Sequence, residues 1–249
     1  VCKVSRSYTI FFLLVLFFKV FCYGRVSLAI SIFFYGLAIY LIKKSKIGKI
    51  IGVLLMLTSL IVHRSMGIPL ACLAVTIFPF TRKTEISLSF IIVIIGGAFA
   101  YLVLSGGLFS QGSVMAGRIS SYNEQIAEGE WSGANFVGIM MRALQYLLFY
   151  YIFLVLRSLV YKYRPDNELI MGMYKITWVL ILFSTAFLIA MGYTPYFYRV
   201  MNITILPLCI MLTYFMSRNQ IKKKQYYAIM GLAFFFHNLN FYSIYINCI

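Results

Sequence analysis

Apolar segments recur along the whole chain and constrain its fold more than any other feature. Of the 249 residues, 62% are hydrophobic and only 11% are charged. A soluble domain has too little interior for so much apolar surface, whereas a bilayer accommodates helices of about 20 apolar residues. We therefore predict an all-α, polytopic transmembrane helical bundle of about nine helices, within a range of eight to ten. The expected segments are 8–23, 26–42, 50–63, 66–80, 86–109, 136–157, 169–191, 198–216 and 226–247.

The connections between these segments alternate between strongly basic and weakly charged. Five basic clusters, each an even number of crossings from the others, hold fifteen of the 22 lysines and arginines. They are Lys3 and Arg6; Lys43, Lys44, Lys46 and Lys49; Arg82 and Lys83; Arg157, Lys162 and Arg164; and Arg218, Lys222, Lys223 and Lys224. Because basic loops stay on the cytoplasmic side, we predict a cytoplasmic N-terminus and an outer C-terminus.

Two of the segments, 50–63 and 66–80, are short for a hydrocarbon core of about 30 Å at about 1.5 Å per residue. They either span with flanking residues or form a re-entrant hairpin, and both alternatives keep the neighbouring basic clusters on one face. The long hydrophilic stretch 110–135 is expected to be an extracytoplasmic loop, either functional or a flexible tether. We expect 1–249 to be a single integral-membrane domain, and truncation at either end is left open because the chain begins with Val.

Composition and motifs argue against several classes of protein. The net charge of +16 would suit nucleic-acid binding, but the cations lie in short clusters between apolar runs, so we expect no nucleic-acid partner. Five cysteines without CxxC spacing and only two histidines predict no metal site. The sequence has no Walker A, GxGxxG or GxSxG motif and no spaced carboxylate pair inside an apolar segment. We therefore expect neither a metal nor a cofactor.

Four arginines depart from the charge pattern because they fall on the outer side: Arg64, Arg118, Arg142 and Arg199. A cation near or inside a bilayer costs free energy unless it pairs with an anion or faces a watery cavity. Few acids lie close to these arginines in the sequence. The anion that best suits a membrane setting is a lipid-linked phosphate or pyrophosphate. We therefore expect the four side chains to converge on one outward-facing cavity.

Each of these positions has a functional and a structural interpretation. His63 would accept a proton or donate to a phosphate oxygen beside Arg64, or the pair simply ends a helix with Arg64 extending to the interface. Arg142 lies about two turns inside its segment and either binds an anion or extends outwards. Arg199 lies among interfacial tyrosines and precedes Asn202 and a proline, a combination that favours a site.

Three short stretches of the predicted outer side combine an arginine with hydroxyl or aromatic neighbours. They are His63-Arg64-Ser65 before a short Pro-containing helix, Arg118-Ile-Ser-Ser-Tyr122 with the spacing Arg118-x10-Gly129, and Tyr196-Phe-Tyr-Arg199-Val-Met-Asn-Ile-Thr-Ile-Leu-Pro207. Read together over roughly residues 50–216, they resemble the motifs of the EpsG-like and Wzy-type polymerases of bacterial O-antigen, capsule and exopolysaccharide. The chain departs from that pattern in having one long outer loop rather than two, and fewer helices.

The resemblance implies a glycosyltransferase of the bacterial cytoplasmic membrane with an outward-facing active site. It would polymerise polyprenyl-pyrophosphate-linked oligosaccharide repeat units, with arginines stabilising the departing pyrophosphate. The expected substrate-binding residues are Arg64, Arg142, Arg199, Tyr196 and Asn202. The expected catalytic residues are His63, Arg118 and Glu124, with His63 or Glu124 as the base. Expected partners are the lipid-linked glycan, the bilayer and other polysaccharide-assembly proteins such as a chain-length regulator.

Two other functions remain open from the sequence. A transporter, such as a flippase for the same lipid-linked glycan, would need repeated halves and a site near the bilayer midplane. No duplicated halves are visible, and the unexpected arginines lie toward one face. A ligase that passes finished glycan to another acceptor would use the same chemistry as a polymerase, and the sequence does not separate the two.

Overall fold

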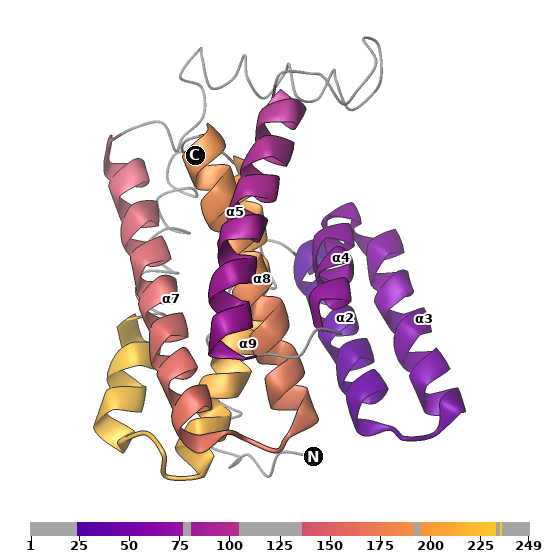
Figure 1. Cartoon of the computed structure of the whole chain (residues 1–249). Helices are drawn as coiled ribbons and strands as arrows, with labels where there is room; N and C mark the ends of the chain where they lie inside the picture. Colours follow the sequence, from indigo (N-terminus) through magenta and orange to yellow (C-terminus); the bar gives the residue numbers. More distant parts are fainter. Residues whose placement is uncertain (1–23, 77–80, 105–135, 192–194, 233–234, 236–249) are drawn as a thin grey trace.

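The structure is a computed structural model that describes residues 24–76, 81–104, 136–191, 195–232 and 235. This part of the chain is all-helical and contains no strand. The elements are α2 (Gly24–Ile42), α3 (Lys46–Val62), the 3-10 turn η1 (Arg64–Met66), α4 (Gly67–Thr76), α5 (Arg82–Leu104), α7 (Phe136–Tyr163), α8 (Glu168–Met191) and α9 (Pro195–Ser217). A further helix covers 223–232. Figure 1 shows the long helices running roughly side by side as one bundle.

Four of the described helices are long and apolar enough to cross a membrane. They lie within α2, α7, α8 and α9, with mean hydropathies between 1.2 and 1.9 over their apolar windows. This agrees with the predicted class of an all-α membrane protein. The predicted total of nine helices stays a prediction, because segment 8–23 and most of 226–247 lie outside the described residues.

The described helices match seven of the predicted segments, but several boundaries differ. Helix α3 begins at Lys46 because the side chain of Ser45 accepts a hydrogen bond from the backbone N–H of Gly48 (3.1 Å) and caps the helix. Helix α7 continues to Tyr163, so the basic residues Arg157 and Lys162 belong to the helix rather than to a loop. The described part of α4 has ten residues, about 15 Å at 1.5 Å per residue, so this part alone does not span a bilayer.

Helices α2 and α3 form a tight hairpin in which glycines allow the backbones to meet. A β-carbon placed on Gly36 would lie 2.8 Å from the carbonyl oxygen of Gly52, and one on Gly52 would lie 2.8 Å from the carbonyl oxygen of Gly36. Small residues at facing positions are a common way for membrane helices to pack closely. The hairpin docks on α8, where a β-carbon on Gly172 would lie 2.5 Å from Cδ1 of Leu41.

The centre of the bundle is the pair α8 and α9. About 72% of the apolar window of α8 and 83% of that of α9 is buried within the protein, against 33% for α2 and 28% for α7. Helices α2, α4 and α5 pack on α8, and α7 packs mainly on α9. The outer helices expose large apolar side chains, for example Ile61, Phe90 and Leu147, as expected of surfaces that face lipid.

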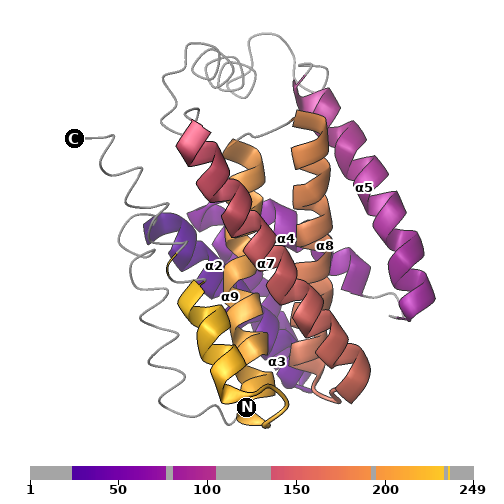
Figure 2. The same ribbon diagram turned by 90° about the vertical axis from the view of Figure 1, so that its left-hand side faces the viewer.

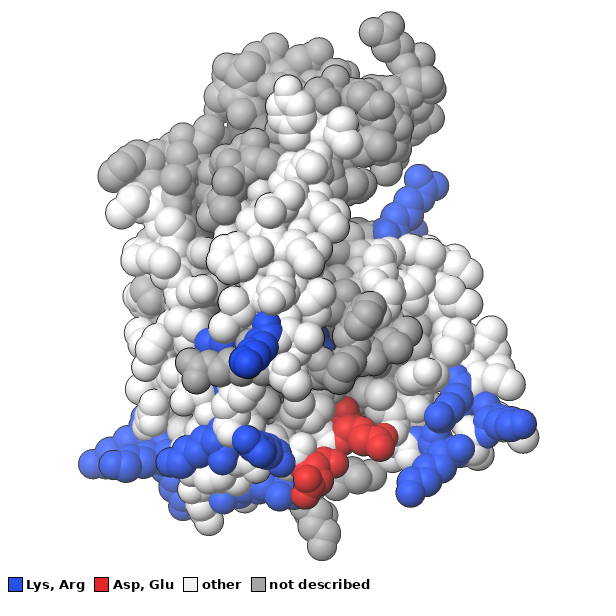
Figure 3. Space-filling model, viewed as in Figure 1, with Lys and Arg blue, Asp and Glu red and all other residues white. Residues whose placement is uncertain are grey.

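The two ends of the bundle differ in charge. The α2–α3 connection, the start of α5, the α7–α8 connection and the end of α9 all lie toward the lower end in Figure 1. Figure 3 shows most of the visible lysines and arginines gathered along that edge, with the visible acids between them. We call this the lysine-rich end, and we call the opposite end, where α7 and α9 begin, the arginine end. The gathering agrees with the predicted alternation of loops, while the orientation in a membrane stays a prediction.

Candidate functional site

His63 forms a compact turn between α3 and η1. Its backbone is extended (φ −151°, ψ 119°), so it ends α3 and caps η1. The ring atom Nδ1 lies 2.6 Å from Oγ of Ser65 and accepts a hydrogen bond from the backbone N–H of Ser65 (3.3 Å). Because Nδ1 accepts, a neutral ring carries its proton on Nε2. The turn therefore fixes the ring and gives it a donor nitrogen.

Arg64 follows His63 in the same turn and is exposed. Since α3 runs from its lysine-rich start at Lys46 to Val62, Arg64 lies at the arginine end of the bundle. The turn contacts α2, α3 and α4. The two views of the molecule place α3 and α7 on opposite flanks. The η1 turn that carries Arg64 is thus separated from α7. Because the side chain of Arg142 lies outside the described part, a cavity shared by the two arginines stays a prediction.

Arg142 and Arg199 both lie within the first two turns of their helices, α7 and α9. Helices α7 and α9 pack against each other and begin at the same end of the bundle (Figure 2). Tyr196 belongs to the first turn of α9, and Asn202 lies six residues after it, buried with 8% of its surface exposed. The side chains of Arg142, Arg199 and Tyr196 lie outside the described part, so their convergence stays a prediction.

Two expected catalytic residues, Arg118 and Glu124, lie in the stretch 105–135 and outside the described residues. The whole predicted outer loop 110–135 also lies outside the described residues. Of the four outer arginines, the structure therefore places the backbones of Arg142 and Arg199 on the helix pair α7 and α9, and that of Arg64 on the separate η1 turn. They hold no cluster of three His, Cys, Asp or Glu side chains that suits a metal ion.

The described part of the chain contains a second polar site, at the lysine-rich end, that the sequence interpretation missed. Its centre is Glu85 in the first turn of α5, which is 1% exposed. One carboxylate oxygen accepts hydrogen bonds from Nε of Arg157 (2.8 Å) and from the hydroxyl of Tyr174 (3.0 Å). The other oxygen accepts from the hydroxyl of Tyr161. Three helices, α5, α7 and α8, therefore meet at one buried carboxylate, which we call the Glu85 cluster.

The Glu85 cluster is held by aromatic packing as well as by hydrogen bonds. The ring of Tyr174 stacks on Phe153 with centroids 5.6 Å apart and planes at 9°. The guanidinium of Arg157 lies 5.5 Å from the centroid of the Tyr161 ring. A carboxylate that accepts three hydrogen bonds, one from a cation, is compensated for the loss of water around it. The cluster therefore links by hydrogen bonds three helices that otherwise meet through apolar side chains.

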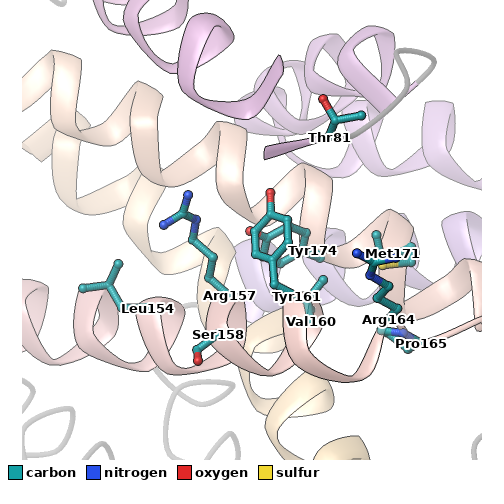
Figure 4. Close-up of a pocket in the computed structure, with 10 residues that line it drawn as sticks. All are labelled: Thr81, Leu154, Arg157, Ser158, Val160, Tyr161, Arg164, Pro165, Met171 and Tyr174. Atoms are coloured by element: carbon teal, nitrogen blue, oxygen red, sulfur yellow. The ribbon is translucent and has the colours of Figure 1, made fainter. Parts of the chain in front are cut away.

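A cavity of about 860 Å³ lies beside this cluster and is lined mostly by α7 (Figure 4). Its polar wall includes Arg157, Ser158, Tyr161 and Arg164, and Tyr174 and Thr81 contribute from α8 and from the start of α5. Figure 4 shows the two arginines toward opposite ends of this wall, with the tyrosines between them. The volume falls in the range of small-molecule sites, about 300–1,000 Å³.

Arg164 has an unusual backbone at the edge of this cavity. It follows the last residue of α7, its N–H donates to the carbonyl oxygen of Val160 (2.9 Å), and its φ is +41°. This left-handed conformation closes many helices but is normally occupied by glycine, since a β-carbon makes it cost about 1–2 kcal/mol. Pro165 prevents the helix from continuing. A costly backbone at a cavity wall is a reason to suspect function.

Two signals in the sequence point to the Glu85 cluster. Glu85 is one of only six acids and stands at the start of an apolar segment, and Arg157 and Tyr161 have the four-residue spacing that places them on one helix face. The sequence interpretation assigned Arg157 only to a basic loop. The partners are separated by 72 to 89 residues, so local spacing alone does not bring them together.

Comparison with known proteins gives a family but no individual relative. Neither the curated proteins nor the solved structures contain a significant match. The sequence model of the EpsG family matches residues 1–248, essentially the whole chain. The match covers every described helix and both polar ends of the bundle. The chain therefore belongs to the EpsG family.

Proposed function

We propose that this protein is an integral-membrane glycosyltransferase that polymerises polyprenyl-pyrophosphate-linked oligosaccharide repeat units into surface polysaccharide. We place it in the bacterial cytoplasmic membrane with its active site facing outward. Membership of the EpsG family supports an exopolysaccharide-related membrane protein, and four long apolar helices are consistent with a membrane location. The sequence motifs around His63, Arg118 and Arg199 support the polymerase reaction.

The observation that carries the proposal is the pair of arginines at the starts of two packed helices. Arg142 and Arg199 lie in the first two turns of α7 and α9, which contact each other. The start of a helix carries partial positive charge from its unpaired N–H groups. Adding an arginine to each start makes this end attractive to an anion. A pyrophosphate linked to a membrane lipid is an anion that reaches this depth.

In the proposed reaction, a sugar hydroxyl of one lipid-linked unit attacks the anomeric carbon of another. The new glycosidic C–O bond forms as the bond from that carbon to the pyrophosphate oxygen breaks. The polyprenyl pyrophosphate leaves with the bonding electron pair, and Arg118, Arg142 and Arg199 stabilise its charge. Asn202 would contact the bound glycan or phosphate, and Arg64, on the separate η1 turn, would contact the glycan away from the pyrophosphate. Both substrates share one bilayer, so holding them in register contributes much of the acceleration.

The geometry of the His63 turn supports a division of acid and base roles. Nδ1 of His63 accepts from Ser65, so the neutral ring presents Nε2–H as a donor. In this tautomer Nε2 has no lone pair with which to accept the proton of an attacking hydroxyl. We therefore assign the base role to Glu124, and His63 would contact the glycan beside Arg64.

The test is the glycan length profile of cells in which the native protein is replaced by single variants. Arg199→Ala is expected to abolish long-chain polysaccharide at unchanged protein abundance, with short lipid-linked units accumulating outside the membrane. Lys223→Ala is the matched control. It removes one exposed cation at the lysine-rich end, after the end of α9, and should leave the glycan chain length unchanged.

Other outcomes of this test would contradict the polymerase. Complete polymer stranded on its lipid carrier would identify a ligase, and lipid-linked units held on the cytoplasmic face would identify a flippase. Normal chain lengths in both Arg199→Ala and Arg118→Ala cells would overturn the proposal altogether. Protein abundance measured in the same membranes separates a lost activity from a lost protein.

A further inference from the structure

The cavity at the lysine-rich end has the features of a binding site that is separate from the proposed reaction site. It lies between α5, α7 and α8, close to the end of α7, whereas Arg142 and Arg199 lie near the starts of α7 and α9. Arg142 and Arg157 are 15 residues apart on α7, about 22 Å at about 1.5 Å per residue. One substrate phosphate does not reach both.

Arg157 presents unused hydrogen-bond donors to this cavity. Within the described residues its guanidinium donates one hydrogen bond, from Nε to Glu85, and stacks on the ring of Tyr161. A guanidinium has five N–H donors, so its two terminal nitrogens remain available. Glu85 is a positioning residue here, because the bond to Nε fixes the direction in which the terminal nitrogens point.

Arg164 supplies a second cation on the same wall. It lies seven residues after Arg157, two helical turns further toward the lysine-rich end. Its left-handed backbone (φ +41°) is maintained at a position where glycine would be the ordinary residue. Ser158 also lines the cavity, with its hydroxyl pointing away from both guanidinium groups (Figure 4). Two cations on one wall offer hydrogen-bond donors to the oxygens of a phosphate group.

The cavity wall changes from charged to apolar along α7. Arg164 lies at the lysine-rich end, Arg157 and Ser158 lie two turns deeper, and Leu154, which is 42% exposed, lies about one turn deeper again. That order matches a phosphate ester whose polar group stays at the bilayer surface while its chain enters the apolar layer. We propose that this cavity binds the phosphate group of an anionic ester, and that the ester is a membrane lipid.

The proposal is independent of the glycosyl transfer, and its test measures binding by the purified full-length chain in detergent. The probes are phosphatidic acid, the matching diacylglycerol without phosphate, and glycerol 3-phosphate without acyl chains. Binding is followed by native mass spectrometry and by the rise in melting temperature. Phosphatidic acid is expected to bind and to raise the melting temperature, whereas diacylglycerol is not.

The informative variant is Arg164→Gly, which removes the cation and also relieves the left-handed backbone, so folding is preserved. It should weaken phosphatidic acid binding by about tenfold, the effect of one charge-assisted hydrogen bond. The matched control is Lys162→Gln, which removes one charge from the same end of α7 at a residue that stacks on Tyr163 (5.2 Å) outside the cavity wall. It should weaken binding by less than about twofold.

Each result decides one part of the proposal. Equal loss in Arg164→Gly and Lys162→Gln would reduce the effect to general surface charge and overturn the site. Equal binding of diacylglycerol would overturn the phosphate requirement. If glycerol 3-phosphate binds as tightly as phosphatidic acid and is equally sensitive to Arg164→Gly, the phosphate site stands and the lipid source is overturned. Cells that carry Arg164→Gly or Lys162→Gln should show unchanged protein abundance and normal glycan lengths, because neither residue lies at the proposed reaction site.

Discussion

The two ends of the bundle use arginine in opposite ways. At the lysine-rich end, Arg157 donates to a buried carboxylate that also receives hydrogen bonds from Tyr161 and Tyr174. At the arginine end, Arg142 and Arg199 begin two packed helices, while the acids of the described residues, Glu85, Asp166 and Glu168, all lie at the other end. The Glu85 cluster is internally compensated, and in the proposed function the other end binds an external anion. Substitutions at the first should therefore act on stability, and substitutions at the second on activity.

The largest expected effect comes from removing the centre of the Glu85 cluster. Glu85→Ala leaves Arg157 unpaired and takes the acceptor from Tyr161 and Tyr174, which should cost about 3 kcal/mol of unfolding free energy. Denaturant or thermal unfolding of the detergent-solubilised protein measures the loss. Asp166→Ala removes an exposed acid near the same end and should change stability by less than about 0.5 kcal/mol. Equal losses of unfolding free energy in the two variants would show that the Glu85 cluster stabilises the protein no more than an exposed acid does.

Replacing arginine by lysine at each end sharpens the comparison, because it keeps the positive charge and removes the paired N–H donors of the guanidinium. Arg157→Lys removes the Nε donor to Glu85 (2.8 Å) and should cost about 2 kcal/mol of stability. Arg199→Lys should leave the melting temperature unchanged and reduce polymer formation by about tenfold, since an ammonium does not grip pyrophosphate bidentately. A stability loss at Arg199 as large as that at Arg157 would argue for an internally paired residue there.

A smaller effect separates charged from neutral partners. Tyr174→Phe removes a hydroxyl that donates to the carboxylate of Glu85, and we expect a loss of about 1.5 kcal/mol. Tyr146→Phe, its matched control, removes a hydroxyl that pairs with the neutral hydroxyl of Thr185 (2.5 Å) nearer the arginine end, and should cost about 0.5–1 kcal/mol. Melting curves of the two variants, measured in parallel, test the difference. A larger loss in Tyr146→Phe than in Tyr174→Phe would refute it.

The smallest expected effect has the opposite sign. Arg164→Gly should raise unfolding free energy by about 1 kcal/mol, because glycine adopts the φ of +41° without the penalty of a β-carbon. Asn219→Gly at φ +56°, after the end of α9, should gain only a few tenths, since asparagine tolerates this conformation better than arginine. A destabilised Arg164→Gly protein would indicate that the Arg164 side chain contributes to folding rather than to ligand binding.

The sequence predicts the secondary structure well because the signal for an apolar helix is local. Seven predicted segments coincide with described helices, and the basic clusters mark one end of the bundle. The boundaries near charged residues are less accurate. Helix α7 continues six residues past its predicted end at 157, because arginine and lysine end an apolar run but are good helix formers.

The candidate sites are harder to predict because they depend on which helices meet. Glu85 and Tyr174 are 89 residues apart in the sequence, and no periodicity states that α5 packs on α8. Arg64 was expected to share a cavity with the other outer arginines, and this stays a prediction, because the side chains of Arg142 and Arg199 lie outside the described part. Charge and hydropathy along one chain do not encode which helices pair.

The glycine seam between α2 and α3 has a consequence for how the protein is made. The hairpin closes through residues 43–45 and needs no later part of the chain, so it can pair as soon as both helices have left the ribosome. Gly172 of α8, on which it docks, is synthesised 110 residues after the end of α3 at Val62. At about 5–20 residues per second, the finished hairpin is present in the bilayer for about 5–20 seconds before that part of α8 is made.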